Sequence, residues 1–224
     1  MRCRALSIAV GAALLLTACG GHPLDDMKGP QIAAAAATAL EKAGAVHVKG
    51  TVEQDGEAGR VDLQMQGKDT LGTLTFNGAD VQLLTVGGTS YLQGKPEFWS
   101  SLGLPAEDTA QFAGRWVAVP EQQQAVFGHF SLAGFVDQLR KPSSTVKDEV
   151  TSDEVDGDPV VVLEQKDGST LTVANDAKPY PLEVADKGAG QGGTPSKLTF
   201  SRFGKKQDIN APSDPLDLTE ILGG

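Results

Sequence analysis

Hydrophobic and polar residues alternate with a period of two over much of the chain. The pattern is clearest in two stretches, with apolar positions at Val46, Val48 and Val52 and then at Val61, Leu63 and Met65. This period is typical of β-strands with one buried face. Three further runs follow at 72–78, 80–86 and 90–94, and short glycine-rich joints separate all five. Because no joint is long enough for a crossover connection, the pattern predicts an antiparallel five-stranded meander.

Strand patterns return in the second half of the chain, at 159–165, 169–175, 179–186 and 196–204. Asp167 and Gly168 supply a hairpin turn between the first two. Pro179 and Pro181 place the start of the third strand at an edge or a bulge, since proline cannot donate to the ladder. The acidic segment before them, 143–158, fits either a connecting loop or an exposed strand. We therefore expect about ten antiparallel strands.

Two segments carry a helical period instead. From Pro30, apolar residues recur at helical spacing through an alanine-rich run that ends at Gly44, which predicts a helix with a slim apolar face. A second helix follows Ser131, a suitable N-cap, and its apolar residues fall at i, i+3, i+4 and i+7: Leu132, Phe135, Val136 and Leu139. The segment 95–120 after the meander reads as mostly irregular. The layout is α+β.

The N-terminus has the features of a bacterial lipoprotein signal. Arg2 and Arg4 precede an apolar run too short to span a membrane, and "LTAC" at residues 16–19 ends it. Small residues before a cysteine resemble a lipobox, in which Cys19 receives a diacylglyceryl group and becomes the first mature residue. Two acyl chains suffice for stable anchoring. The alternative is an ordinary secretory signal that happens to end near a cysteine.

These features predict a division into four parts and a location. We expect a signal peptide at 1–18, a lipidated tether at 19–30, one domain at 31–212 and a loosely packed tail at 213–224. The protein would then sit on the extracytoplasmic face of the cell membrane. Since Cys3 leaves with the signal and Cys19 carries lipid, the domain has no disulfide and no thiolate metal site.

Charge and motif content exclude several classes of function. Without the signal, 17 basic residues face 29 acidic ones, a net charge of −12, which argues against nucleic-acid binding. None of the usual nucleophile, zinc or nucleotide motifs occurs. His22 falls in the tether and His47 within a strand, while His129 reads as a partly buried packing residue. We expect neither catalysis nor a cofactor nor a metal site.

The order of several segments resembles the actinobacterial LppX/LprG lipoproteins, which belong to the wider group with the fold of LolA, the periplasmic lipoprotein carrier. The segments run from the lipobox to the end of the domain: "AGAVHVKGTV", "VGGTSYLQG" before "FWSSLG", "GRWVAVP", "VDGDPVVVLE", "KPYPLEV" and "KLTFSRFGKKQDINAP". The resemblance implies a large curved half-barrel sheet with helices over its concave face, enclosing an apolar cavity. It also implies a non-enzymatic monomer without cofactors that carries or presents lipids or acylated glycolipids, and that could receive them from an envelope transporter.

The resemblance gives candidates for the cavity wall from the sheet and from the helical cover. They are Val61, Leu63, Met65, Leu74, Phe76 and Leu83, with Phe130, Phe135 and Leu139. Apolar alternation looks the same when such side chains simply close a dry core. Trp99 and Trp116 would lie at the cavity mouth or pin the middle segment to the sheet. The alternative function is an envelope sensor or protein-interaction lipoprotein with the same fold and no lipid transport.

Overall fold

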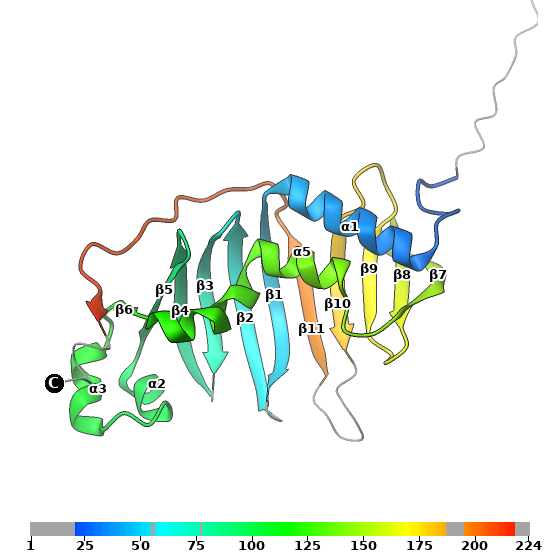
Figure 1. Cartoon of the computed structure of the whole chain (residues 1–224). Helices are drawn as coiled ribbons and strands as arrows, with labels where there is room; N and C mark the ends of the chain where they lie inside the picture. The colour runs from blue at the N-terminus through cyan, green and yellow to red at the C-terminus, as the bar shows by residue number, and fades with distance from the viewer. Residues whose placement is uncertain (1–20, 55–56, 77, 187–194, 218–224) are drawn as a thin grey trace, which may run out of the picture.

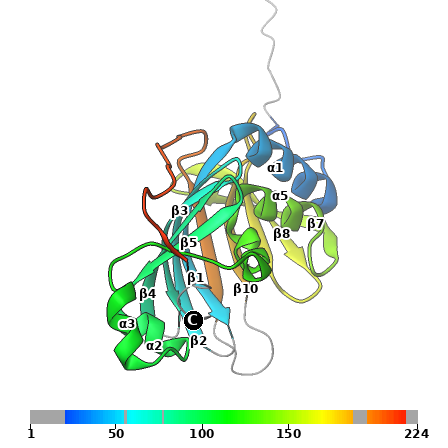
Figure 2. The same ribbon diagram turned by 60° about the vertical axis from the view of Figure 1, so that its left-hand side comes forward.

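The computed structural model describes residues 21–54, 57–76, 78–186 and 195–217. Within them, twelve strands form one curved sheet with helices over its concave face (Figure 1; Figure 2). The strand order is β12-β6-β5-β4-β3-β2-β1-β11-β10-β9-β8-β7, and only the β12–β6 pair is parallel. The predicted α+β class with a large curved antiparallel sheet is confirmed. The predicted signal peptide and Cys19 lie outside the described residues.

The first half of the sheet is the predicted meander, with a short sixth strand added. Its strands are β1 (Ala45–Gln54), β2 (Glu57–Gln66), β3 (Asp69–Phe76), β4 (Ala79–Val86), β5 (Thr89–Gly94) and β6 (Val117–Ala118). In the β1–β2 ladder Val48 lies opposite Leu63, and Val46 lies opposite Met65. Because directly paired residues share a face, the apolar positions of neighbouring strands align on the concave side.

The second half returns from the far edge of the sheet toward the centre. It comprises β7 (Val146–Val155), β8 (Asp158–Gln165), β9 (Thr170–Ala174), β10 (Pro181–Asp186) and β11 (Ser196–Ser201). β11 then pairs with β1, so the first and last long strands meet in the middle. β10 is internal, and its proline-rich start coincides with a register shift between Pro181 and Glu183. Of the two predicted alternatives for the start of this strand, the β-bulge is correct and the position at a sheet edge is wrong.

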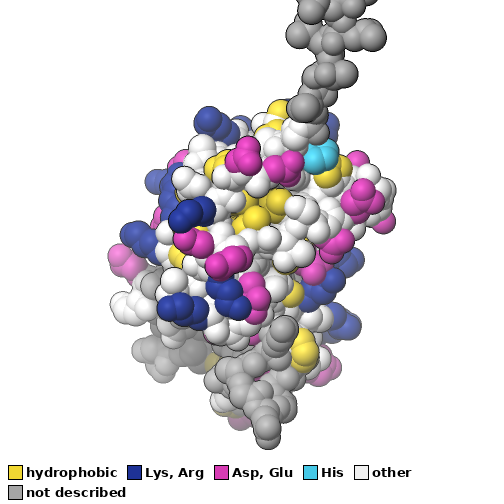
Figure 3. Space-filling model, turned by 90° about the vertical axis from the view of Figure 1, so that its right-hand side faces the viewer, with side chains coloured by type: hydrophobic (Ala, Val, Ile, Leu, Met, Phe, Trp, Pro, Cys, Tyr) yellow, Lys and Arg dark blue, Asp and Glu magenta, His cyan; other side chains and the backbone are white. Residues whose placement is uncertain are grey.

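The acidic segment is strand β7 at one edge of the sheet. Both residues of its hairpin turn into β8, Asp156 and Gly157, have positive φ (55° and 87°), as a type I′ turn requires. The strand is largely exposed. Acidic side chains, intermixed with lysine and arginine, are scattered over this end of the molecule among uncharged residues (Figure 3). Pairing with β8 makes this polar segment a strand, and charge along its open edge discourages pairing with another chain.

Helix α1 (Gly29–Ala43) is the predicted alanine-rich helix. Its buried face includes Ile32, Ala33, Ala36, Ala37 and Leu40. The small alanine side chains allow the helix backbone to lie close to the sheet. Gly44 ends the helix in a left-handed conformation with φ of 67°, and its N–H donates to the carbonyls of Leu40 and Glu41.

The chain crosses the concave face between β6 and β7, which stand at opposite ends of the sheet. At about 4.8 Å per strand spacing, ten strand positions amount to roughly 48 Å along the sheet. The crossing contains η1 (Glu121–Gln123), α4 (Gln124–Phe127), η2 (Gly128–Phe130) and α5 (Leu132–Arg140). Ser131 caps α5 as predicted, its Oγ accepting from the N–H of Gly134. Because the chain must pass from β6 to β7 at the far edge of the sheet, α5 lies over the concave face.

The segment predicted as mostly irregular contains two further short helices, α2 (Pro96–Ser101) and α3 (Ala106–Phe112). Trp99 is 1 % exposed and packs between Phe98 and Phe112, with ring centroids 5.0 and 5.3 Å away. It belongs to the main core and pins this segment to the sheet. Trp116 is half-buried. The sequence pattern did not predict α2 and α3, because their aromatic residues pack together without a regular helical spacing.

Two further expectations are wrong. His129 is exposed in η2, where its neighbour Phe130 packs against the main core instead, so His129 is not a packing residue. The tail is not loose throughout: β12 (Leu216–Asp217) pairs with β6, and the N–H of Leu216 donates to the carbonyl of Trp116 at 2.8 Å. The exposed backbone of an edge strand provides this partner.

Candidate functional site

The structure brings most of the predicted cavity residues together on the concave face. The five from the sheet are at most 8 % exposed and belong to one apolar cluster: Val61, Leu63, Met65, Leu74 and Leu83. Phe135 is buried in the same cluster, and Phe130 and Leu139 pack against it half-buried. Phe76 is in β3, but its side chain is outside the described part of the structure.

The cover is attached to the sheet by a few specific contacts. The ring of Phe135 in α5 meets that of Phe200 in β11 edge to face, with centroids 5.5 Å apart. At η2, the hydroxyl of Thr70 in β3 donates to the carbonyl of Phe130 at 2.8 Å. Before α5, the cover consists of η1, α4 and η2, each about one helical turn long, and such short helices have little internal stability of their own.

A second apolar cluster lies beneath α1 and joins the first. It contains residues of α1 and of strands β8 and β9, together with Leu24: Ile32, Ala33, Ala36, Val161, Leu163, Leu171 and Val173. Leu139 and Val184 pack against both clusters. The apolar interior is therefore continuous from the first meander to the second.

One row of the concave face is only partly covered. Val52, Val184 and Leu198 belong to β1, β10 and β11, and all three are half-buried while packing against the main cluster. Leu198 pairs with both Gly50 and Val184, so the row runs across neighbouring strands. These residues were not among the predicted wall positions. The period-two pattern of their strands indicated that these residues face the concave side. It did not indicate that the helices leave this row partly uncovered.

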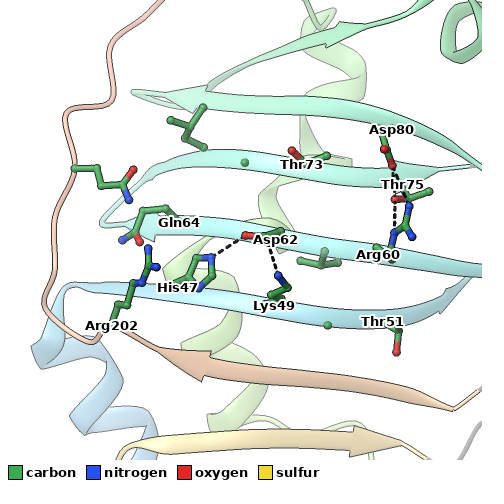
Figure 4. A pocket seen from close by; sticks show the side chains of 15 residues that line it. His47, Lys49, Thr51, Arg60, Asp62, Gln64, Thr73, Thr75, Asp80 and Arg202 are labelled. Atoms are coloured by element: carbon green, nitrogen blue, oxygen red, sulfur yellow. Dashed lines mark hydrogen bonds and ion pairs between the residues drawn. The ribbon is translucent and has the colours of Figure 1, made fainter.

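The opposite face of the sheet carries a polar groove of about 690 Å³ between β1 and β4 (Figure 4). At its centre Asp62 accepts from Nε2 of His47 at 2.7 Å and pairs with Nζ of Lys49 at 3.2 Å. Burial alone would raise the pKa of Asp62, but these hydrogen bonds outweigh it and hold the pKa below the usual 3.8. The carboxylate therefore stays ionised at neutral pH.

A second carboxylate lies at one end of this groove. The hydroxyl of Thr75 donates to Asp80 at 2.7 Å, and the guanidinium of Arg60 lies 3.6 Å from the same oxygen. The hydrogen bond from Thr75, followed by the charge of Arg60, lowers the pKa of Asp80.

Among the described residues no group of three or more His, Cys, Asp or Glu side chains is placed to hold a metal ion. None of the described helices is long and apolar enough to cross a membrane.

Comparison with known proteins gives a structural neighbour. No protein-family model and no curated protein matches the sequence. Among solved structures, LprF from Mycobacterium bovis superposes with a TM-score of 0.52 at 16 % identity, over 83 % of this chain and 97 % of LprF. At this identity the likeness concerns the fold alone. The chain therefore has the open, curved antiparallel-sheet fold that LprF also has.

Proposed function

We propose that this protein binds the acyl chains of a lipid or glycolipid between the concave face of its sheet and the helical cover. It carries or presents that lipid in the cell envelope without catalysing a reaction. A diacylglyceryl group on Cys19 anchors it to the extracytoplasmic face of the membrane.

The observation that carries the proposal is the half-buried row at Val52, Val184 and Leu198. The row continues the apolar interior, so a hydrocarbon chain laid along it would lose water on the side that faces the row. A fully buried methylene contributes about 0.8 kcal/mol, so ten methylenes half-buried against the row would contribute about 4 kcal/mol before the cost of ordering the chain. Deeper entry requires the single-turn elements of the cover to move aside.

Two further points support the proposal. The order of sequence segments resembles the LppX/LprG lipoproteins, for which lipid carriage is the implied function. The fold agrees with that resemblance, since LprF shares the curved sheet across nearly its whole length.

The test combines native lipid analysis with a blocked variant. Mass spectrometry of the protein, extracted from its own membrane under non-denaturing conditions, should detect a bound lipid. Leu198→Trp fills the open row and should weaken binding of a fluorescent fatty-acid probe about tenfold, which corresponds to losing about 1.4 kcal/mol. Thr199→Trp is the matched control, because Thr199 follows Leu198 in β11, is exposed and points to the opposite face of the sheet.

Failure has a clear form in this experiment. The proposal is wrong if no lipid co-purifies and the wild-type protein takes up no probe. It is also wrong if both tryptophan variants weaken the probe equally. Thermal unfolding of each variant distinguishes a blocked site from an unfolded protein.

One observation favours a second function, that of an envelope sensor or protein-interaction lipoprotein. Val48, Leu63, Met65 and Leu83 are 0 % exposed, so the chain itself fills this part of the interior. A filled interior predicts that cross-linking on intact cells recovers a protein partner while no lipid co-purifies. The same lipid analysis therefore separates the two functions.

A further inference from the structure

The groove on the outer face is separated from the apolar interior by the sheet itself. It is lined by side chains of β1 to β4 and by Arg202 and Gln207 from the segment after β11. Its volume of about 690 Å³ lies in the range of small-molecule sites. Charged side chains line it, so a hydrocarbon chain there would desolvate them without compensation. The groove therefore suits a polar ligand, whatever the interior binds.

The charge of the groove is opposite to that of the protein. The whole chain has a net charge of −10, yet the lining contains three cations, Lys49, Arg60 and Arg202, against the two carboxylates of Asp62 and Asp80. Both carboxylates are already paired, Asp62 with Lys49 and Asp80 with Arg60. Arg202 takes part in none of the ion pairs found between described residues. Its guanidinium is thus available to an anion from outside.

Two of the three cations, Arg202 and Arg60, stand at the two ends of an elongated surface, and Lys49 lies between them beside Asp62. In Figure 4, Arg202 lies beside His47 and Gln64 at one end, and Arg60 lies with Asp80 and Thr75 at the other. In the ladders, His47 is level with Ser201, the neighbour of Arg202, and Thr51 is level with Arg60. Four residues along a strand span about 13 Å. A ligand filling the groove would therefore be longer than a lone phosphate ion.

The surface between the ends offers hydrogen-bonding groups. The hydroxyls of Thr51, Thr73 and Thr75 and the carboxylate of Asp62 line it. Gln64 is 5 % exposed, and its Nε2 donates to the carbonyl of Lys205 at 2.9 Å. Its Oε1 is buried without a hydrogen-bond partner among the described residues. A buried acceptor of this kind is costly unless a donor reaches it, and a shift of the Gln64 side chain toward the groove would let a ligand hydroxyl supply one.

We propose that this groove is a second binding site, for a phosphorylated sugar or polyol. The phosphoryl group binds the guanidinium of Arg202, whose planar fork suits bidentate contact with phosphate oxygens. The hydroxyl groups of the ligand extend toward Arg60, donating to Asp62 and Gln64 and contacting the threonines. The same chemistry occurs in a free sugar phosphate and in the phosphorylated headgroup of a lipid.

The first test measures binding of glucose 6-phosphate by NMR titration of the backbone amides of His47, Gln64 and Arg202. We expect saturable shifts that weaken as salt is added, with much smaller effects from glucose and from inorganic phosphate. Arg202→Gln should weaken binding at least about tenfold, and Arg202→Lys should weaken it less, because the charge remains but the fork is lost. Lys166→Gln is the control: it removes one positive charge at an exposed turn remote from the groove.

A second arm identifies the source of the phosphoryl group. Protein with Cys19→Ser, which has no acyl anchor, is mixed with phosphatidylcholine vesicles that contain phosphatidylglycerol or lack it. Sedimentation only with the former, lost in Arg202→Gln, supports a lipid headgroup, whereas binding of glucose 6-phosphate without sedimentation supports a free ligand. The proposal is overturned if neither probe binds, if glucose binds as well as glucose 6-phosphate, or if Lys166→Gln weakens binding as much as Arg202→Gln.

Discussion

Gly50 is the position where adding a single methyl group should disturb the sheet most directly. It lies in β1, the central strand, and is paired on one side with Val61 and on the other with Leu198. A Cβ atom at this position would lie 1.9 Å from the carbonyl oxygen of Lys197 and 3.0 Å from Cα of Leu198. No side-chain rotation relieves this contact, since both neighbours are backbone atoms. Gly50→Ala therefore forces β1 and β11 apart.

The size of the effect follows from the distances. Ordinary contact for a Cβ begins at about 3.4 Å, so the strands must separate by more than 1 Å locally. That separation breaks one or two ladder hydrogen bonds, each contributing about 0.5–1.5 kcal/mol, and leaves their buried partners unpaired at further cost. We expect a loss of about 2–4 kcal/mol in the free energy of unfolding. For a chain of this size that is a fall of about 5–15 °C in melting temperature.

Thermal and urea unfolding followed by circular dichroism measure this loss, and two glycines serve as controls. Gly128 is exposed with open space around its Cβ position, so Gly128→Ala should change stability by less than about 0.5 kcal/mol. Gly67 has open space but a φ of 56°, so Gly67→Ala should cost about 1 kcal/mol from backbone strain alone. If Gly50→Ala is as stable as Gly128→Ala, the close approach of β1 and β11 is refuted.

Three more substitutions test other parts of the structure. Leu83→Ala removes a fully buried side chain from the concave face and should cost about 2–5 kcal/mol in urea unfolding. Ser131→Ala removes the cap of α5 and should cost about 1 kcal/mol, measured the same way, with Thr38→Ala, at an exposed position in α1, nearly neutral. Asp62→Asn should lower the melting temperature at pH 7. Because the folded state lowers the pKa of Asp62, this difference should shrink as the pH falls below 3.8, and a difference that persists at low pH would contradict the pairing.

The alternating pattern was sufficient for the long strands because each of them has one buried face. The pattern placed Val61, Leu63 and Met65 on one side of their strand, and all three are buried there. The two longest helices were predictable for the corresponding reason, as Leu40 and Phe135 recur at helical spacing on buried faces. Local periodicity records burial wherever an element meets the core along its whole length.

Elements that do not bury one face along their whole length show no such periodicity in the sequence. β7 is exposed along most of its length, so its sequence shows charge rather than alternation, and only its pairing with β8 makes it a strand. β12 is two residues long and exists because β6 offers an open edge. The half-buried row at Val52, Val184 and Leu198 depends on where the helices end, which is a property of three strands and their cover together.

The amino-acid sequence by itself determined the period, length and turns of the strands, the two main helices and the apolar side of each, because these depend on residues within a few positions of one another. Only the tertiary structure decided that β11 closes against β1, that α5 crosses the concave face, and that Arg202 joins His47, Asp62 and Arg60 in one groove. Those outcomes depend on contacts between residues up to about 150 positions apart, as with Lys49 and Thr199. Local preference carries no information about such pairs, since they form only when the whole sheet assembles.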